Sequence, residues 1–304
     1  MATVRRAPGE VPRALGALRK GVRAVEPDIV HFQSEIVPRL DPIAVRVIRR
    51  HAPVVITAHD PVPHEAGAHD LERQARVWRS ADAVVIHGED QRRVVDEYAP
   101  GTDVRVIPVD LRLGGPRVTR TTARSQLGLG SEPIALLLGL LRSYKGLALL
   151  ADAWPAVVRK IPAARLAVVG ATIGPVPELE LLRAAPKVDV RRGFVADDEV
   201  DLWAAAADVL ALPYAHGSHS GILHRGLAMG TPVLASPPLA DEVLRTQAGR
   251  VVPLESDAWS AALTAALGAD PIPPPPEPRG VRTVADTLVL YRDLLDERRR
   301  GRAK

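Results

Sequence analysis

The amino-acid sequence predicts an α/β protein built on parallel β-sheets. Short apolar runs rich in β-branched residues recur along the 304 residues, and each is followed by a longer stretch with helical spacing. This alternation is typical of parallel strands joined by crossover helices. Residues 111–132 interrupt it with a stretch rich in Gly, Thr and Arg, which indicates a connection between two domains.

The predicted elements form two series, one on each side of that connection. The first series has strands near residues 28–32, 54–58, 83–87 and 104–108. The second has strands near 134–139, 165–170, 188–191, 209–213, 232–235 and 250–253. Residues 269–278 then predict a stiff proline-rich spacer, and a last helix begins at Val281 with apolar residues on one face.

Composition narrows the function classes. The chain has no cysteine, so it has no disulfide framework, thiolate nucleophile or thiolate metal site. Aromatic residues make up only 3%, which leaves few platforms for stacking nucleic-acid bases and makes nucleic-acid binding a weak alternative. The net charge of +4 favours phosphates or an anionic membrane surface. The sequence shows neither a membrane-spanning run nor a signal-peptide core, so we expect a cytoplasmic protein.

Several common catalytic motifs are missing from the sequence. There is no Gly-x4-Gly-Lys-Ser/Thr phosphate loop, no Gly-x-Gly-x-x-Gly fingerprint after a strand and no His-Glu-x-x-His. Residues 217–221 have the glycine spacing of a nucleophile elbow, but His219 stands where the serine is needed. The serine-hydrolase interpretation therefore fails.

Two loops are predicted at the carboxyl edge of the second sheet, where ligands bind in open α/β sheets. Arg142 and Lys145 follow the strand 134–139, and each could contribute about 1.5–3 kcal/mol to binding a diphosphate. The loop 214–221 opens a helix with small residues, whose backbone N–H groups can bind an anion. The alternatives are two solvated cations and a loop that only turns, but the two loops together favour a bound phosphate.

An ordered set of motifs resembles retaining glycosyltransferases of family 4, which have the GT-B fold. Donor-domain resemblance lies in Arg142-Ser143-Tyr144-Lys145-Gly146, residues 192–195 and 197–200, Leu212-Pro213-Tyr214, Ser218-His219-Ser220-Gly221 and residues 230–233. Acceptor-domain resemblance lies in residues 27–31, 57–60, 63–65 and 81–85. Together the motifs cover residues 24–300. The Ser-x-Ser-Gly loop resembles one subgroup of the family.

The resemblance implies two Rossmann-like parallel-sheet domains facing a cleft. Residues 114–280 would bind the nucleoside diphosphate sugar, and residues 1–113 would form the acceptor domain, completed by the helix 281–304. The implied site residues are listed by role: Arg142, Lys145, Ser220 and Gly221 for the diphosphate; Gly193, Phe194 and Val195 for the base; His59 and Asp60 for catalysis. The resemblance implies no cofactor and no metal, because protein cations and helix dipoles neutralise the charge.

Two departures from the family pattern matter. Gly217 and Arg225 stand where the family usually has glutamates, so recognition of the donor ribose by Glu is unsupported. In addition, only about 25 residues precede the strand 28–32, fewer than one βαβ unit needs, so we expect a sheet that lacks its leading strands. The basic residues 4–24 would form either a helix touching membrane phosphates or a solvated basic helix.

The nine histidines raise a metal alternative. His216, His219 and His224 lie close in sequence, and His59, His64 and His69 recur every five residues. No cysteine is available and His224 would lie in a helix, so we expect no metal. For His59 the alternative role is a structural hydrogen bond.

The sequence therefore predicts a metal-independent retaining glycosyltransferase that moves a sugar from a nucleoside diphosphate to a saccharide or lipid-linked glycan. It would act in the cytoplasm, with peripheral contact to the membrane as a further option. The alternative is a catalytically impaired subunit that binds a nucleotide sugar or a partner enzyme, which Gly217 and Arg225 favour.

Overall fold

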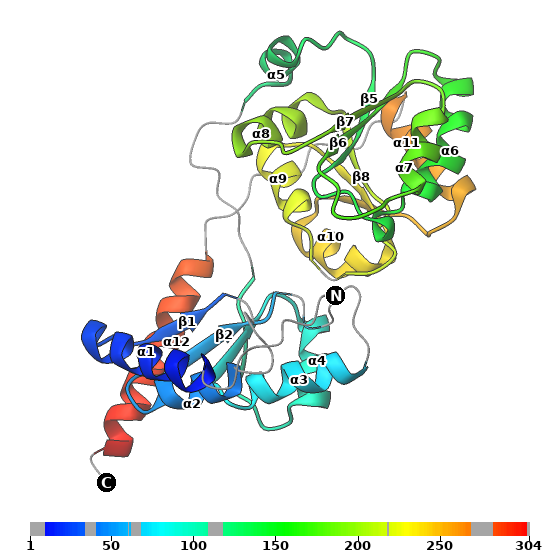
Figure 1. Cartoon of the computed structure of the whole chain (residues 1–304). Helices are drawn as coiled ribbons and strands as arrows, with labels where there is room; N and C mark the ends of the chain where they lie inside the picture. The colour runs from blue at the N-terminus through cyan, green and yellow to red at the C-terminus, as the bar shows by residue number, and fades with distance from the viewer. Residues whose placement is uncertain are drawn as a thin grey trace. The chain divides into compact units, whose positions relative to one another are not determined.

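The computed structural model describes residues 10–33, 41–59, 61, 68–108, 118–217, 219–268 and 282–302. It contains two all-parallel sheets, of four and six strands, which confirms the α/β class. The chain forms two compact units, Met1–Val109 with Val281–Lys304, and Asp110–Gly280 (Figure 1). Among the helices described, none is both long and apolar enough to cross a lipid bilayer. The proline-rich spacer lies outside the described residues.

The sheet of the first unit has the order β1-β2-β3-β4. Its strands are β1 (Val30–Phe32), β2 (Val54–Thr57), β3 (Ala83–Ile86) and β4 (Val104–Val106). One face packs against α1 (Glu10–Val25), α2 (Asp41–Arg49), α3 (Ala68–Trp78) and α4 (Glu89–Tyr98). β2 and β3 are buried on both faces, whereas β1 is half-buried and lies at one edge of the described sheet.

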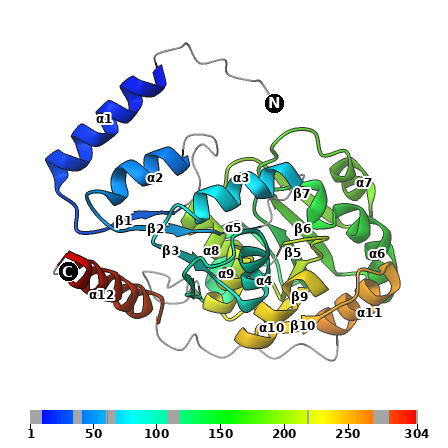
Figure 2. The ribbon, with the colours of Figure 1, turned by 90° about the horizontal axis from the view of Figure 1, so that it is seen from below.

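The other face of this sheet is covered by the last helix, α12 (Arg282–Arg302) (Figure 2). Leu290 and Leu294 are buried against Val55 and Val85. Polar contacts extend the interface: the Thr283 hydroxyl donates to the Pro108 carbonyl (2.6 Å), Arg105 pairs with Asp293 (3.2 Å), and Arg298 donates to the Arg49 carbonyl (3.0 Å). The two ends of the sequence therefore build one unit.

His31 on β1 joins this helix to the sheet by two hydrogen bonds. Its Nδ1 lies 2.6 Å from the Tyr291 hydroxyl, and its Nε2 lies 2.7 Å from the Thr57 hydroxyl. Burial lowers the pKa of His31, and repulsion from His59 lowers it further. The neutral imidazole is therefore the form that the folded unit stabilises.

The sheet of the second unit has the order β10-β9-β8-β5-β6-β7. From β5 (Ile134–Leu138) the chain runs outward through β6 (Arg165–Gly170) and β7 (Val188–Arg192). It then returns to the other side of β5 with β8 (Val209–Leu212), followed by β9 (Val233–Ala235) and β10 (Gly249–Val251). The strand order reverses between β5 and β8, and open α/β sheets bind ligands at the carboxyl ends of strands at such a point.

Helices cover both faces of this sheet. The apolar face of Ala135 and Leu137 packs against α6 (Leu147–Lys160), α7 (Glu178–Ala184) and α11 (Ser256–Leu267). The opposite face packs against α8 (Asp197–Ala206), α9 (Gly221–Met229) and α10 (Ala240–Thr246). A further helix, α5 (Arg120–Leu127), packs on α8. β5 is buried on both faces, as its continuous run of apolar residues predicts.

In each unit an aspartate at the amino end of the sheet accepts a hydrogen bond from the first N–H of a neighbouring strand. Asp208, just before β8, accepts hydrogen bonds from the Ile134 N–H (2.7 Å) and the Arg124 guanidinium (2.8 Å). Asp82, just before β3, accepts from the Val54 N–H (2.7 Å) and pairs with Arg49. These carboxylates satisfy the first N–H of a neighbouring buried strand, which would otherwise lack a partner.

The lowered pKa of His31 predicts that acid weakens the first unit. The unfolded chain takes up the proton more readily than the folded unit, so the stabilisation is fully present above pH 6.5 and is lost as the pH falls below that value. We expect thermal denaturation to show a steeper loss of stability between pH 7 and pH 5 for the wild type than for His31→Asn. Equal pH dependence in the two proteins would contradict this prediction.

Candidate functional site

The loops that follow β5 and β8 meet where the strand order reverses. The Ala215 N–H donates to the Tyr144 carbonyl at 2.7 Å. The Tyr144 ring stacks on His216 at 4.6 Å between centroids and meets Tyr214 edge-on at 5.7 Å. The structure thus brings together the two loops that the sequence placed at one sheet edge.

Glycine lets these loops approach closely. Gly146 has a φ of +73°, and a Cβ there would overlap the Pro213 carbonyl oxygen. Gly139 has a φ of +105°, and a Cβ there would lie 3.2 Å from Ile222 Cγ1. Larger residues at either position would be strained and would push the β5 loop away from the β8 loop.

Lys145 is buried in this junction, with 6% of its surface exposed. Its Nζ donates to the Tyr214 hydroxyl at 3.1 Å and lies 4.8 Å from the centre of that ring. No carboxylate pairs with it among the residues that the structure describes. Burying an ammonium group without an anion is unfavourable, so the junction is suited to an anionic ligand.

Arg142 precedes the short 3-10 helix Ser143–Lys145 and is half-buried. Within the described part of the chain its guanidinium forms no hydrogen bond or ion pair. Arg142 and Lys145 therefore place two positive charges, without carboxylate partners among the described residues, in one loop at the carboxyl edge of the sheet.

The start of α9 differs from the sequence prediction. Ser220 caps the helix, because its hydroxyl accepts from the Leu223 N–H at 3.3 Å. The Ser220 N–H donates to Glu242 Oε2 at 3.0 Å, so it is engaged by a carboxylate of the protein and not free for a diphosphate as predicted. The Gly221 N–H makes no hydrogen bond with a described residue. Ser218 lies outside the described residues.

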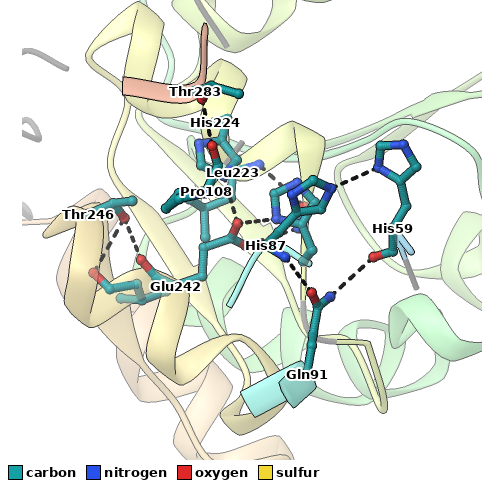
Figure 3. Close-up of polar contacts among 12 residues, drawn as sticks. His59, His87, Gln91, Pro108, Leu223, His224, Glu242, Thr246 and Thr283 are labelled. Atoms are coloured by element: carbon teal, nitrogen blue, oxygen red, sulfur yellow. Dashed lines mark hydrogen bonds and ion pairs between the residues drawn. The ribbon is translucent and has the colours of Figure 1, made fainter. Parts of the chain in front are cut away.

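Glu242 is a site residue that the sequence analysis missed. His219 Nδ1 lies 2.6 Å and His224 Nε2 lies 2.7 Å from the same Glu242 oxygen, Oε1. Figure 3 shows His224 and Glu242 in this contact. Burial raises the pKa of Glu242, but the hydrogen bonds and positive charge of the two histidines outweigh that effect and lower it to about 2. His216, the third histidine of the predicted group, instead stacks on Tyr144.

The predicted base-binding residues follow β7, two strands from β5 or about 10 Å across the sheet. Gly193 has a φ of +151°, and Val195 packs against the apolar core. Phe194 is 90% exposed. An exposed aromatic ring at this edge is a surface on which a base can stack.

Arg225, the departure from the family pattern, lies on α9. It forms ion pairs with Asp201 at 2.6 Å and with Asp197 at 3.3 Å, and its side chain is 20% exposed. Its charge is therefore balanced by α8, and the residue links the two helices.

In the first unit, His59 follows β2 and contacts His87, which follows β3 (Figure 3). His87 Nδ1 donates to the Ile107 carbonyl at 2.9 Å, and its Nε2 lies 2.9 Å from His59 Nδ1. A neutral His87 that donates from Nδ1 must accept at Nε2, so His59 carries its proton on Nδ1. The basic lone pair of His59 is then on Nε2. Asp60 lies outside the described residues.

Gln91 holds the backbone of both His59 and His87 in place. Its amide nitrogen donates to the His59 carbonyl at 3.1 Å, and its amide oxygen accepts from the His87 N–H at 2.7 Å. The sequence analysis missed Gln91 and His87, although His87 ends a predicted strand. Strand ends at the carboxyl edge are the positions where such residues are expected.

Two family models match the chain, each over one unit. "Glycosyltransferase Family 4" matches residues 2–109, and "Glycosyl transferases group 1" matches residues 132–269. No curated protein gives a significant match.

Many solved structures share the fold. A sucrose-phosphate synthase from Thermosynechococcus elongatus has a TM-score of 0.70 at 19% identity, covering 97% of this chain and 77% of its own. HepE from Anabaena, in complex with UDP-glucose, has a TM-score of 0.68 at 16% identity, covering 96% and 82%. An α,α-trehalose-phosphate synthase (UDP-forming) from Burkholderia xenovorans, in complex with glucose-6-phosphate, has a TM-score of 0.64 at 12% identity, covering 93% and 75%.

These structural matches confirm the expected GT-B class of fold. The chain is thus similar to family 4 glycosyltransferases over its first unit and to group 1 glycosyl transferases over its second.

Proposed function

We propose that this protein transfers a sugar, with retention of configuration, from a nucleoside diphosphate to a saccharide or lipid-linked glycan, as in polysaccharide biosynthesis. The observation that carries the proposal is the buried Lys145, which has no carboxylate partner among described residues and lies where the strand order reverses. A diphosphate supplies the missing negative charge. HepE structures hold UDP and UDP-glucose, so a uridine diphosphate sugar is the first donor to test.

The donor would lie along the carboxyl edge of the second sheet. Lys145 and Arg142 hold the diphosphate by charge-assisted hydrogen bonds, and the Gly221 N–H adds a neutral donor at the start of α9. Gly193, Phe194 and Val195 flank the base, with the Phe194 ring stacked on it. The distance of two strands between these groups suits a nucleoside diphosphate.

In the reaction, the bond between the anomeric carbon and the diphosphate oxygen breaks as the acceptor oxygen bonds to the same face of that carbon. The acceptor hydroxyl gives its proton to the leaving diphosphate. Lys145 and Arg142 stabilise the negative charge that develops there, so the step requires no metal ion. His59, held by His87 and Gln91, acts on the transferred sugar. We also propose a catalytic role for Asp60, the residue that follows His59 in the sequence.

A second candidate is a subunit that binds a nucleotide sugar without transferring it. Its specific support is Arg225, which stands where the family usually has a glutamate. Arg225 forms an ion pair with Asp201. Two measurements separate these functions: UDP binding, and release of UDP from UDP-sugars in the presence of candidate acceptors. A protein that binds UDP but releases none with any acceptor would be the binding subunit and not the transferase.

Peripheral contact with a membrane is proposed for α1. Leu18 and Val22 pack against the core of the first unit, whereas Arg13, Arg19, Lys20 and Arg23 are exposed. Sedimentation with vesicles of anionic lipids, compared with neutral ones, tests this contact.

Removal of either cation should weaken nucleotide binding. Arg142→Ala and Lys145→Met should each raise the dissociation constant for UDP by about 10- to 100-fold, the equivalent of one charge-assisted hydrogen bond. Calorimetry measures the affinity, and Lys160→Met at the far end of α6 is the matched control. The melting temperature should change little, because neither cation has a carboxylate partner among described residues to lose. Unchanged UDP affinity in both variants would remove the phosphate clamp.

Loss of His59 should affect turnover and not donor binding. His59→Ala should lower kcat by about 10² to 10⁴, a typical range for positioned acid–base groups. His87→Ala should lower kcat less, and the double variant should be no worse than His59→Ala, because His87 acts through His59. His51→Ala, at the amino side of β2, is the control. A loss below tenfold for His59→Ala would return His59 to a structural role.

Phe194 should bind the base and not the phosphates. Phe194→Ala should weaken UDP binding by about 5- to 100-fold, the range of one aromatic–base stack, and leave pyrophosphate binding unchanged. Leu181→Ala, which also removes an exposed apolar side chain, should leave both affinities unchanged. Equal losses for UDP and pyrophosphate would argue against stacking.

A further inference from the structure

Three side chains near the start of α9 converge on one point. His219 Nδ1, His224 Nε2 and a Glu242 carboxylate oxygen all lie within 4.8 Å of one another. Both imidazole nitrogens approach the same oxygen, at 2.6 and 2.7 Å. Ligands of a tetrahedral zinc ion, each about 2.0–2.1 Å from the metal, lie roughly 3.3 Å apart. Small side-chain movements would therefore make room for an ion between the three atoms.

The donor set suits zinc. Two imidazoles and one carboxylate form a known three-ligand zinc set, whereas magnesium and calcium prefer oxygen ligands alone. The second oxygen of Glu242 accepts the Ser220 N–H at 3.0 Å. Hydrogen bonds of this kind hold metal ligands in position and add to metal affinity.

Burial also favours an ion at this place. The side chains of Glu242 and His224 are 3% exposed, and that of His219 is 16% exposed. The cluster is thus closed toward the helices and reachable at His219, which gives an ion a route in. A divalent ion would also balance the negative charge of this buried carboxylate.

We propose that His219, His224 and Glu242 bind one zinc ion that joins the start of α9 to α10. The ion is structural: it holds the loop that ends at Gly221, and it takes no part in sugar transfer. This site differs from the histidine group considered from the sequence, because Glu242 takes the place of His216.

The test uses the full chain without an affinity tag, after treatment with a chelator. Titration with zinc chloride should show one ion bound per chain and a higher melting temperature. His219→Ala should weaken zinc binding by more than about 100-fold, because loss of a partner outside the coordination sphere already costs 10- to 100-fold. His216→Ala, which changes a neighbouring exposed histidine, and His59→Ala, which disrupts the other histidine pair, should both bind zinc like the wild type.

Cobalt(II) provides a readout on the wild type that does not depend on a folded variant. One equivalent should give the intense visible absorption of tetrahedral coordination, which zinc should abolish. Absence of stoichiometric zinc binding to the wild type would overturn the proposal and leave the three residues as a hydrogen-bonded cluster. Equal zinc affinity in folded His219→Ala and wild type would also overturn it. UDP affinity, measured separately, tests the transferase proposal and not this one.

Discussion

The second unit depends on the placement of β5 between β6 and β8. Because the strand is buried on both faces, its backbone must be fully paired, and the sheet supplies partners on both sides. Asp208 satisfies the first N–H of β5 at the amino end. At the carboxyl end the chain leaves in opposite directions from β5 and β8. At this end Lys145, which follows β5, meets Tyr214, which follows β8.

The two buried charged residues at this edge, Glu242 and Lys145, have different hydrogen-bond partners. Glu242 is a buried anion that accepts from the Ser220 N–H and contacts two imidazoles, and the two histidines lower its pKa despite burial. Lys145 is a buried cation whose described polar partner is a phenol hydroxyl. The protein supplies hydrogen-bond partners to the anion, whereas the cation has no carboxylate partner among the described residues. This asymmetry is a physical reason to look for an anionic substrate here.

The first unit is ordered by contacts between distant parts of the chain. Thr57, at the end of β2, and Tyr291 on α12 both bond His31 on β1, so one imidazole connects three elements. On the same sheet, the Ile107 carbonyl determines which nitrogen of His87 carries the proton, and His87 in turn determines the tautomer of His59. Through His87, the Ile107 carbonyl thus decides which nitrogen of a neutral His59 carries the proton.

The α/β class could be predicted from the amino-acid sequence alone, because alternation of apolar strands and amphipathic helices is a local pattern. It also placed Arg142 and Lys145 beside the loop before α9, because carboxyl ends of parallel strands share one edge. It did not find Gln91 or Glu242, whose hydrogen-bond partners lie on other elements, and it assigned the Ser220 N–H to a ligand when Glu242 accepts it. The contacts of Gln91 and Glu242 became known from the tertiary structure, since hydrogen-bond partners depend on packing between elements and not on spacing along the chain.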